Sequence, residues 1–231
     1  MPKTSSTPDR ILEASLKLFN VQGFQSVTVR KISHSLDISA GHVGYHFKSK
    51  TDIAMALFPR LEEEMRQQVV DIIKPGEHFS AAEGARHASA LVRAMWRYRF
   101  IFDSLNRLLR DDAELRKRYL VLQENIIASA ENAFKRLIAQ KEMLPAKPPN
   151  SPRLLAECWW MMWLGWLRVE ELDYYDCEEL PGSAIFDGAL KTYGIVQGYF
   201  SASFTKEFMR ELARITDTPA SKQRSARSSR Q

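Results

Sequence analysis

Apolar residues recur at helical spacing through almost the whole chain, and no segment alternates regularly between apolar and polar positions. Ile11, Ala14 and Leu18 lie three to four residues apart, so they share one face of a helix. Residues 7–9, Thr-Pro-Asp, favour a helix start, and Gly23 favours its end in a left-handed conformation. The pattern therefore predicts an all-α protein.

Two short helices follow, and each is preceded by a residue that caps helices well. Thr28 precedes the first, residues 29–36, and Ser39 precedes the second, residues 40–47. Residues 37–38, Asp-Ile, form the turn between them, and Asp tolerates a left-handed backbone better than most residues. Together with the preceding helix, these segments predict a small three-helix head.

Longer helices make up the rest of the chain. Residues 49–52 form a capping box that opens a fourth helix to about Ile73, and Pro75-Gly76 breaks the chain after it. The later helical segments are Ser80–Tyr98, Ile101–Leu109, Asp111–Lys141, Ser151–Leu172, Ser183–Phe200 and Thr205–Ile215. The chain thus divides into a disordered arm (1–7), the head (8–55), a helical body (56–216) and a disordered basic tail (217–231).

The positive charge lies at the two ends of the chain. The formal net charge is +5, but residues 1–50 carry seven Lys/Arg against three Asp/Glu. The tail 217–231 carries four against one, so the residues between them are slightly acidic. A basic head on a near-neutral body is typical of a protein that faces nucleic acid.

The remaining composition favours a cytoplasmic protein. Two cysteines, Cys158 and Cys177, are too few for a secreted disulfide framework. The N-terminus has no apolar signal core. The longest apolar run, residues 158–167, is half of the roughly 20 residues that a membrane span needs. We therefore expect no contact with a membrane.

The two short helices of the head have the properties of a DNA-contacting unit. Gly41 and Gly44 each cost about 1 kcal/mol in a helix interior, and close approach to a DNA backbone would offset that cost. Capping residues, histidines, a tyrosine and lysines supply donors for phosphates and base edges. The expected DNA-binding residues are Thr28, Val29, Arg30, Ser39, Ala40, Gly41, His42, Gly44, Tyr45, His46, Lys48 and Lys50.

Two other interpretations of this segment stay open from the residues alone. Any small three-helix unit has caps and glycines, so the geometry by itself does not prove DNA binding. His42 and His46 are spaced to chelate a metal, with Asp37 as a third ligand, but no cysteine or acid cluster lies nearby. We expect neither a metal nor a cofactor.

The segment GFQSVTVRKISHSLDISAGHVGYHFKSKTDI resembles the DNA-binding part of the tetracycline-repressor (TetR) family of bacterial regulators. The likeness covers residues 8–58, and two positions depart from it: Asp37 replaces a usual Gly, and Gly44 replaces a frequent aromatic residue. The matching positions are Gly23-Phe24, Thr28, Ile32, Ser39, Gly41, Tyr45, Phe47, Lys48 and Lys50. The resemblance implies a homodimeric regulator of transcription on a palindromic operator, most often a ligand-responsive repressor, with His42 as the base-reading residue.

The body is similar, more weakly, to one subgroup of TetR-type effector domains. The likeness involves YRFIFDSLNRLLRDDAELRKRY, the Trp-rich helix and TYGIVQGYF, and it extends to about Leu212. It implies dimerisation through the last two long helices, and it does not imply a known ligand. The expected partners are operator DNA, a second copy of the chain, and an apolar or amphipathic small molecule.

The segment CWWMMWLGWL, residues 158–167, is apolar on nearly every side of a helix. Such a helix must be buried on both sides, either between the core and a partner subunit or against an effector pocket. The pocket candidates are Met95, Trp96, Phe100, Phe102, Leu105, Leu122, Trp159, Met162, Trp163 and Trp166. The candidates for the dimer interface are Trp160, Leu164, Gly165, Ile195 and Tyr199.

Four arginines, Arg93, Arg97, Arg99 and Arg107, lie near these aromatic residues. A solvated face explains them most simply, whereas a buried member would indicate an anionic or carboxylate-bearing ligand. The sequence has no Gly-rich phosphate loop and no nucleophile elbow, so we do not expect an enzyme. The alternatives are a ligand-independent DNA-binding regulator and, less well supported, a helical small-molecule-binding protein or an enzyme.

Overall fold

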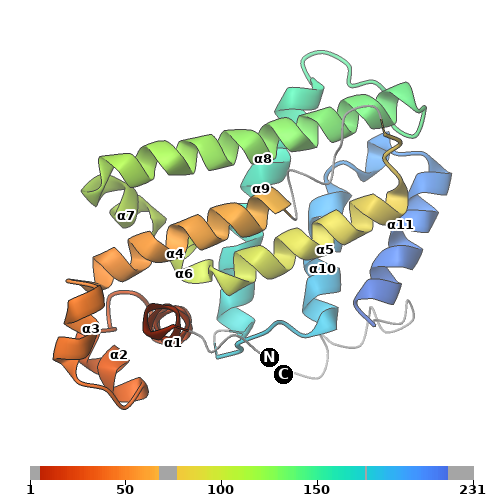
Figure 1. Cartoon of the computed structure of the whole chain (residues 1–231). Coiled ribbons are helices and arrows are strands. Elements are labelled where there is room, and N and C mark those ends of the chain that lie inside the picture. The colour runs from red at the N-terminus through yellow and green to blue at the C-terminus, as the bar shows by residue number, and fades with distance from the viewer. Residues whose placement is uncertain (1–5, 68–76, 175, 218–231) are drawn as a thin grey trace.

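The computed structural model describes residues 6–67, 77–174 and 176–217, and these confirm the all-α prediction (Figure 1). A single antiparallel bridge, Met143–Phe200, is the sole β-type pairing among the described residues. The helices are α1 (Thr7–Gln22), α2 (Val29–Ser35), α3 (Ala40–His46), α4 (Lys50–Met65), α5 (Ala81–Arg97), α6 (Arg99–Asp103), α7 (Leu105–Asp111), α8 (Ala113–Ala139), α9 (Pro152–Tyr174), α10 (Gly182–Gly194), the 3₁₀ turn η2 (Gln197–Tyr199) and α11 (Ala202–Ile215).

The head consists of α1, α2 and α3, with the start of α4 closing it. Ile11 and Phe19 of α1, Ile32 of α2 and Val43 of α3 are all buried in the hydrophobic core. Ile53 at the start of α4 completes this small core. Because each short helix contributes few apolar residues, α2 and α3 depend on this shared core for their stability.

Two turns of the head have the positive φ that their residues favour. Asp37 follows α2 with φ of 53°, as expected of a turn residue that tolerates a left-handed backbone. Gly23 follows α1 with φ of 75° and ψ of 142°. The prediction of a positive φ at Gly23 is therefore correct, but the residue is extended in ψ rather than left-handed helical.

Several predicted boundaries are wrong by a residue or by a local break. Ser6 caps α1 instead of Thr7, and Asp112 caps α8 instead of Asp111, because these are the side chains that accept from the N–H groups of the first turn. The segment 101–109 is interrupted at Ser104, and the helix expected to continue to Phe200 ends at Gly194. Some predicted features lie outside the described residues. These are the end of the fourth helix near Ile73, the Pro75-Gly76 break, most of the arm and most of the tail.

The body is built from long helices in two connected groups (Figure 1). Helix α5 packs on α10 and α11, while α9 packs against α8 on one side and α10 on the other. Helix α7 lies at the end of α8 nearest the head, α6 lies between α5 and α7, and α11 lies at the far end of the body. The two groups meet along α9 and α10, so these helices form the centre of the body.

Tryptophans of α9 fill the middle of this core. Trp159 and Trp163 meet edge to face with ring centroids 5.7 Å apart, and Trp163 and Trp166 do the same at 5.6 Å. Trp160 is also buried, on the side of α9 that faces Tyr119 of α8. Each such side chain removes about 150–250 Å² from water, worth about 4–6 kcal/mol before the conformational entropy cost. This packing places α9 firmly between its neighbours.

In the described parts of the chain, no helix is both long enough and apolar enough to cross a bilayer.

The contact between α9 and α10 requires a residue without a side chain at position 188. A Cβ on Gly188 would lie 2.6 Å from Cε2 of Trp166, which is too close for any real contact. We therefore expect Gly188→Ala to lower the free energy of unfolding by about 1–3 kcal/mol, the usual cost of overpacking. Urea denaturation followed by tryptophan fluorescence measures this change.

Gly194→Ala is the matched control, since the same helix leaves open space around a Cβ at that position. This variant should be as stable as the parent protein or slightly more stable, because Ala favours helix over Gly. If the two variants were equally stable, the Trp166 ring would have to move aside freely, and the tight α9–α10 contact would not be a constraint.

Candidate nucleic-acid interface and effector cavity

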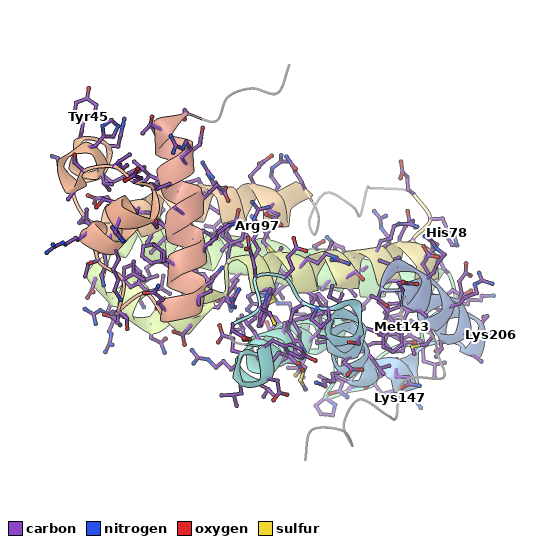
Figure 2. The ribbon with its side chains drawn as sticks, turned by 90° about the horizontal axis from the view of Figure 1, so that it is seen from below. Tyr45, His78, Arg97, Met143, Lys147 and Lys206 are labelled. Atoms are coloured by element: carbon purple, nitrogen blue, oxygen red, sulfur yellow. The ribbon has the colours of Figure 1, made fainter. Side chains whose placement is uncertain are left out.

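The tip of the head is formed by α3, which carries most of the predicted DNA-binding residues. Figure 2 shows Tyr45 at this tip pointing away from the body, and its side chain is 86% exposed. Helix α3 is held to the head through Val43, its one fully buried residue. The other exposed predicted residues are Thr28, Arg30, Ser39, Ala40, Gly41, His42, Gly44 and Lys48. The structure thus brings these residues to one end of the molecule.

The caps predicted for the two short helices are present. Thr28 Oγ1 accepts from the backbone N–H of Lys31 at 3.2 Å, and Ser39 Oγ accepts from the N–H of His42 at 3.0 Å. Each cap satisfies one donor and fixes where its helix begins. These hydrogen bonds hold the first turns of α2 and α3 in place at the surface of the head.

His42 and His46 lie close together on α3, with ring centroids 5.6 Å apart, and Tyr45 is packed edge-on to His46 at 5.1 Å. Among the residues that the structure describes, no group of three His, Cys, Asp or Glu side chains gathers as a metal site would require. His42 is exposed and His46 is half-buried, so His42 is the more accessible donor.

Lys50 has different partners from the phosphate that the sequence led us to expect. Its Nζ donates to the carbonyls of Phe24, Gln25 and Val27 at 2.8, 2.9 and 3.0 Å. It also lies over the Phe24 ring, 4.8 Å from the centroid. Burial lowers the pKa of Lys50, and the charge of Arg107 adds to this effect. All three N–H bonds of the ammonium group are thus used to hold the loop between α1 and α2.

Arg30 and Lys48 are the cations of the tip that remain free. Neither side chain forms a hydrogen bond or an ion pair with any described residue, and both residues are exposed. Lys31, by contrast, donates to Gln22 Oε1 and to the Ser26 carbonyl, each at 3.0 Å. The surface is hollowed between α2 and α3, and several predicted residues line this hollow. His34 also lines it, although the sequence did not indicate His34 as a site residue. Its polar side chain gave no signal beyond that of a solvated helix face.

The body contains an apolar cavity at the end far from the head, between α5, α8, α9, α10 and α11. Its volume is about 70 Å³. Tyr193 stacks on Phe208 with ring centroids 4.3 Å apart, and Phe200 stacks on Tyr193 at 5.1 Å. We call it the aromatic cavity, and its lining is Phe79, Gly84, His87, Ala88, Ala130, Ala133, Phe134, Leu137, Trp159, Ala189, Thr192, Tyr193, Val196, Phe200, Phe204 and Phe208.

Trp159 is the one predicted pocket residue that lines the aromatic cavity. Trp96 lines a different cavity beside the head, Met162 is 37% exposed on the outer side of α9, and Leu105 is half-buried. The other predicted residues are ordinary core: Met95, Phe100, Phe102, Leu122, Trp163 and Trp166. Helical spacing shows which face is buried, but it does not show where neighbouring helices leave space.

The outward face of α9 differs from the predicted dimer interface. Trp160 is 2% exposed and packed inside its own chain, so it is not available to a partner. Leu164 and Tyr199 are half-buried, so only part of each side chain is available to a partner. Gly165 faces open space, and Ile195 is exposed. The exposed apolar residues of this face are Met161, Met162, Val169 and Leu172. The prediction chose the wrong side of α9 at Trp160 because every side of the segment is apolar.

Polar contacts that the sequence did not reveal join the head to the body. Asn20 Nδ2 donates to the Arg97 carbonyl at 2.8 Å, and the backbone N–H of Phe100 donates to Asn20 Oδ1 at 3.2 Å. Phe100 also packs on Phe19 of α1, with ring centroids 5.0 Å apart. The break between α5 and α6 is therefore attached directly to the end of α1.

Helix α4 carries further links between the two parts. Arg60 pairs with Asp9 at 2.5 Å and with Glu13 at 2.7 Å, which fixes α4 against α1. Farther along α4, Glu62 pairs with Arg118 of α8. A displacement of α4 relative to the body would therefore also displace the head.

The chain matches family profiles over both its head and most of its body. Residues 11–57 match the family described as "Bacterial regulatory proteins, tetR family", and residues 60–208 match "Bacterial transcriptional repressor". A 45-residue segment is 44% identical to the probable HTH-type transcriptional regulator YttP of Bacillus subtilis (strain 168). This segment covers 20% of the chain and 22% of YttP, so the match spans about a fifth of that curated relative.

Solved structures resemble the whole fold. A TetR-family transcriptional regulator from Marinobacter aquaeolei VT8 has a TM-score of 0.75 at 22% identity, covering 92% of this chain and 98% of that one. The TetR family transcriptional regulator PfmR from Thermus thermophilus has a TM-score of 0.62 at 17% identity, covering 86% and 100%. At these identities the likeness shows the fold. Because the family matches extend over the head and most of the body, the chain belongs to the TetR family of bacterial transcriptional regulators.

Proposed function

We propose that the protein binds a palindromic operator as a homodimer, and that an apolar or amphipathic small molecule changes its affinity for that operator. The observation that carries the proposal is the tip of the head, where α3 presents exposed polar side chains and Arg30 of α2 and Lys48 after α3 are exposed cations. Two such tips in one dimer would enter successive major grooves about one helical turn apart.

The head supplies two kinds of contact in this proposal. Arg30 and Lys48, whose side chains have no partner among the described residues, would pair with phosphates and set the register on the duplex. His42 and Tyr45 project from α3 and would reach base edges or phosphates. Lys50 takes no part in DNA contact here; it positions the α1–α2 loop from inside the head.

The outward face of α9 is the surface we assign to the dimer contact. Met161, Val169 and Leu172 are large apolar side chains with more than half of their surface exposed. Gly165 lies among them with open space where a Cβ would be, which lets a second helix approach closely. An apolar helix face of this kind is unusual for an isolated chain and is typical of a subunit interface.

The aromatic cavity is the proposed effector site of the body. Its lining is almost wholly apolar, with stacked rings that favour a flat apolar molecule. At about 70 Å³ it is smaller than the roughly 300–1,000 Å³ of sites that hold larger ligands, so entry of a ligand requires the rings to move. This small volume also favours a second candidate function, a DNA-binding regulator that does not respond to a ligand.

A matched pair of lysine variants tests the DNA contact. Lys48→Gln should weaken binding to a selected operator and reduce the slope of log affinity against log salt by about 0.9, because one phosphate contact is lost. Lys50→Gln removes the same charge two residues away, but it should leave that slope unchanged and lower the free energy of unfolding by about 1–2 kcal/mol. Fluorescence anisotropy at several salt concentrations measures the first effect, and urea denaturation measures the second. A reduced salt slope in Lys50→Gln together with an unchanged slope in Lys48→Gln would show that Lys50, and not Lys48, contacts DNA.

The dimer contact is tested on exposed residues whose replacement does not disturb the core. We expect the wild-type protein to sediment as a dimer at micromolar concentration, and Met161→Asp with Val169→Asp to sediment as a monomer with weakened operator binding. Burying two carboxylates against an apolar partner costs several kcal/mol, which explains the expected loss. Val21→Asp, an exposed valine of α1 outside this face, is the control and should stay dimeric. A wild-type monomer would contradict the proposal.

The effector cavity is tested with toluene as a flat apolar probe. We expect toluene to raise the melting temperature and to change operator affinity, whereas Ala88→Leu should abolish both responses because Ala88 lines the cavity. Ala90→Leu on the same helix, outside the lining, should respond as the parent protein does. If toluene altered the melting temperature equally in all three proteins, the ligand-independent candidate would be favoured.

A further inference from the structure

A second, larger cavity lies between part of the head and part of the body. It lies between α1, α5, α10 and the segment that joins α9 to α10, and its volume is about 460 Å³. Figure 2 shows Arg97, one of its lining residues, in the middle of the molecule beside α1. This junction cleft is separate from the aromatic cavity, since the two share no lining residue. Its volume falls within the range of about 300–1,000 Å³ in which proteins hold small ligands.

A buried cation, Arg99, contributes to the lining of the junction cleft. Its side chain is 1% exposed, and the guanidinium lies 4.3 Å from the centroid of Trp96. Nη1 donates to the Trp96 carbonyl at 3.1 Å and Nη2 to the Cys177 carbonyl at 3.0 Å. None of the carboxylates in the described structure lies within 4 Å of this group. An arginine is almost never this deeply buried without an anionic partner, because desolvation of its charge is costly.

The acidic residues around the cleft are mostly neutralised by other cations. Glu178 pairs with Lys17 at 2.7 Å. Glu13 and Glu64 lie 3.8 and 3.7 Å from Arg97. Three of the four lining carboxylates therefore have partners of their own. Among the described residues, this leaves Arg93 at the rim and Arg99 inside as unpaired cations, against the single unpaired acid Glu179.

Glu171 of α9 is the carboxylate whose charge acts on Arg99, and it compensates the charge of Arg99 only in part. Burial, together with the charge of Asp103, raises the pKa of Glu171 to about 7, although Arg99 and Arg168 act in the opposite direction. Near neutral pH the Glu171 carboxyl is therefore protonated in part, which weakens its compensation of the Arg99 charge. Arg99 retains positive charge that neither Glu171 nor the cleft acids offset.

Apart from Asn20, the remaining residues that line the cleft are apolar. Leu16 and Val21 of α1 face Trp96, Leu180 and Ile185 of the body across the cavity. We propose that the junction cleft binds a small amphipathic organic anion, with its carboxylate paired to Arg99 and Arg93 and its apolar part packed between α1 and α10. Arg–carboxylate pairs with partly excluded solvent are among the strong polar contacts in proteins, which makes Arg99 the anchor of the site.

A ligand in this position would touch both the head and the body. Asn20 lines the cleft and also bonds the break between α5 and α6, so an occupied cleft would fix α1 relative to the body. Occupation would then favour one orientation of the head over others and change operator affinity through that difference. This consequence rests on the proposed function, whereas binding of the anion itself does not.

Isothermal titration of the full chain with octanoate, in the absence of DNA, tests the site. Octanamide has the same apolar chain without the charge, so we expect it to bind at least tenfold more weakly. Arg99→Gln should lower octanoate affinity at least tenfold and leave octanamide affinity unchanged. Val21→Trp, at an exposed position of the lining, should block both probes. Arg107→Gln, an exposed cation outside the cleft, should bind octanoate as the wild-type protein does.

Equal affinity for octanoate and octanamide would overturn the proposal, as would octanoate binding that is insensitive to Arg99→Gln. If circular dichroism showed that Arg99→Gln is unfolded, Arg93→Gln at the exposed rim would take its place, and unchanged octanoate affinity in that variant would equally overturn it. Octanoate binding that disappears only in Ala88→Leu would place the ligand in the aromatic cavity and reject the junction cleft. Because no DNA is present, a failure here is distinct from a failure of operator binding.

Discussion

The burial of α9 is the constraint on which the rest of the structure depends. Its tryptophans interlock edge to face and fill the centre of the body, and Trp166 lies so close to α10 that only glycine fits at position 188. With one side of the helix committed to the core, Met161, Val169 and Leu172 are left on the opposite side. The same packing therefore produces both the stable body and the apolar face that we assign to the dimer.

The head depends on the body more than its small size suggests. Phe19 and Phe100 join their cores, Asn20 satisfies backbone groups at the α5–α6 break, and Arg60 fixes α4 to α1. Inside the head, Lys50 performs a comparable task by holding three carbonyls of the α1–α2 loop. The position of the tip that carries α3, relative to the body, is thus set by a few directional contacts.

Much of the head could be predicted because its signals are local. Capping at Thr28 and Ser39 and the positive φ of Asp37 follow from the conformational preferences of single residues, and the structure contains all three. Lys50 shows the limit of such reasoning, since a lysine after a short helix has the same local pattern whether it faces phosphate or its own loop. Its partners at Phe24, Gln25 and Val27 are more than twenty residues away, and spacing along one helix cannot reveal them.

In the body, the difference between what the sequence predicts and what the packing of helices decides is larger. Periodicity and composition were enough to establish an all-α chain with a basic head, because both depend on which residues are neighbours along the sequence. The side of α9 that faces outward, the position of the aromatic cavity and the burial of Arg99 were settled only when helices distant in sequence packed together. The physical reason is that a void or an unpaired charge is a property of several surfaces at once. No single segment carries information about the space that its neighbours leave.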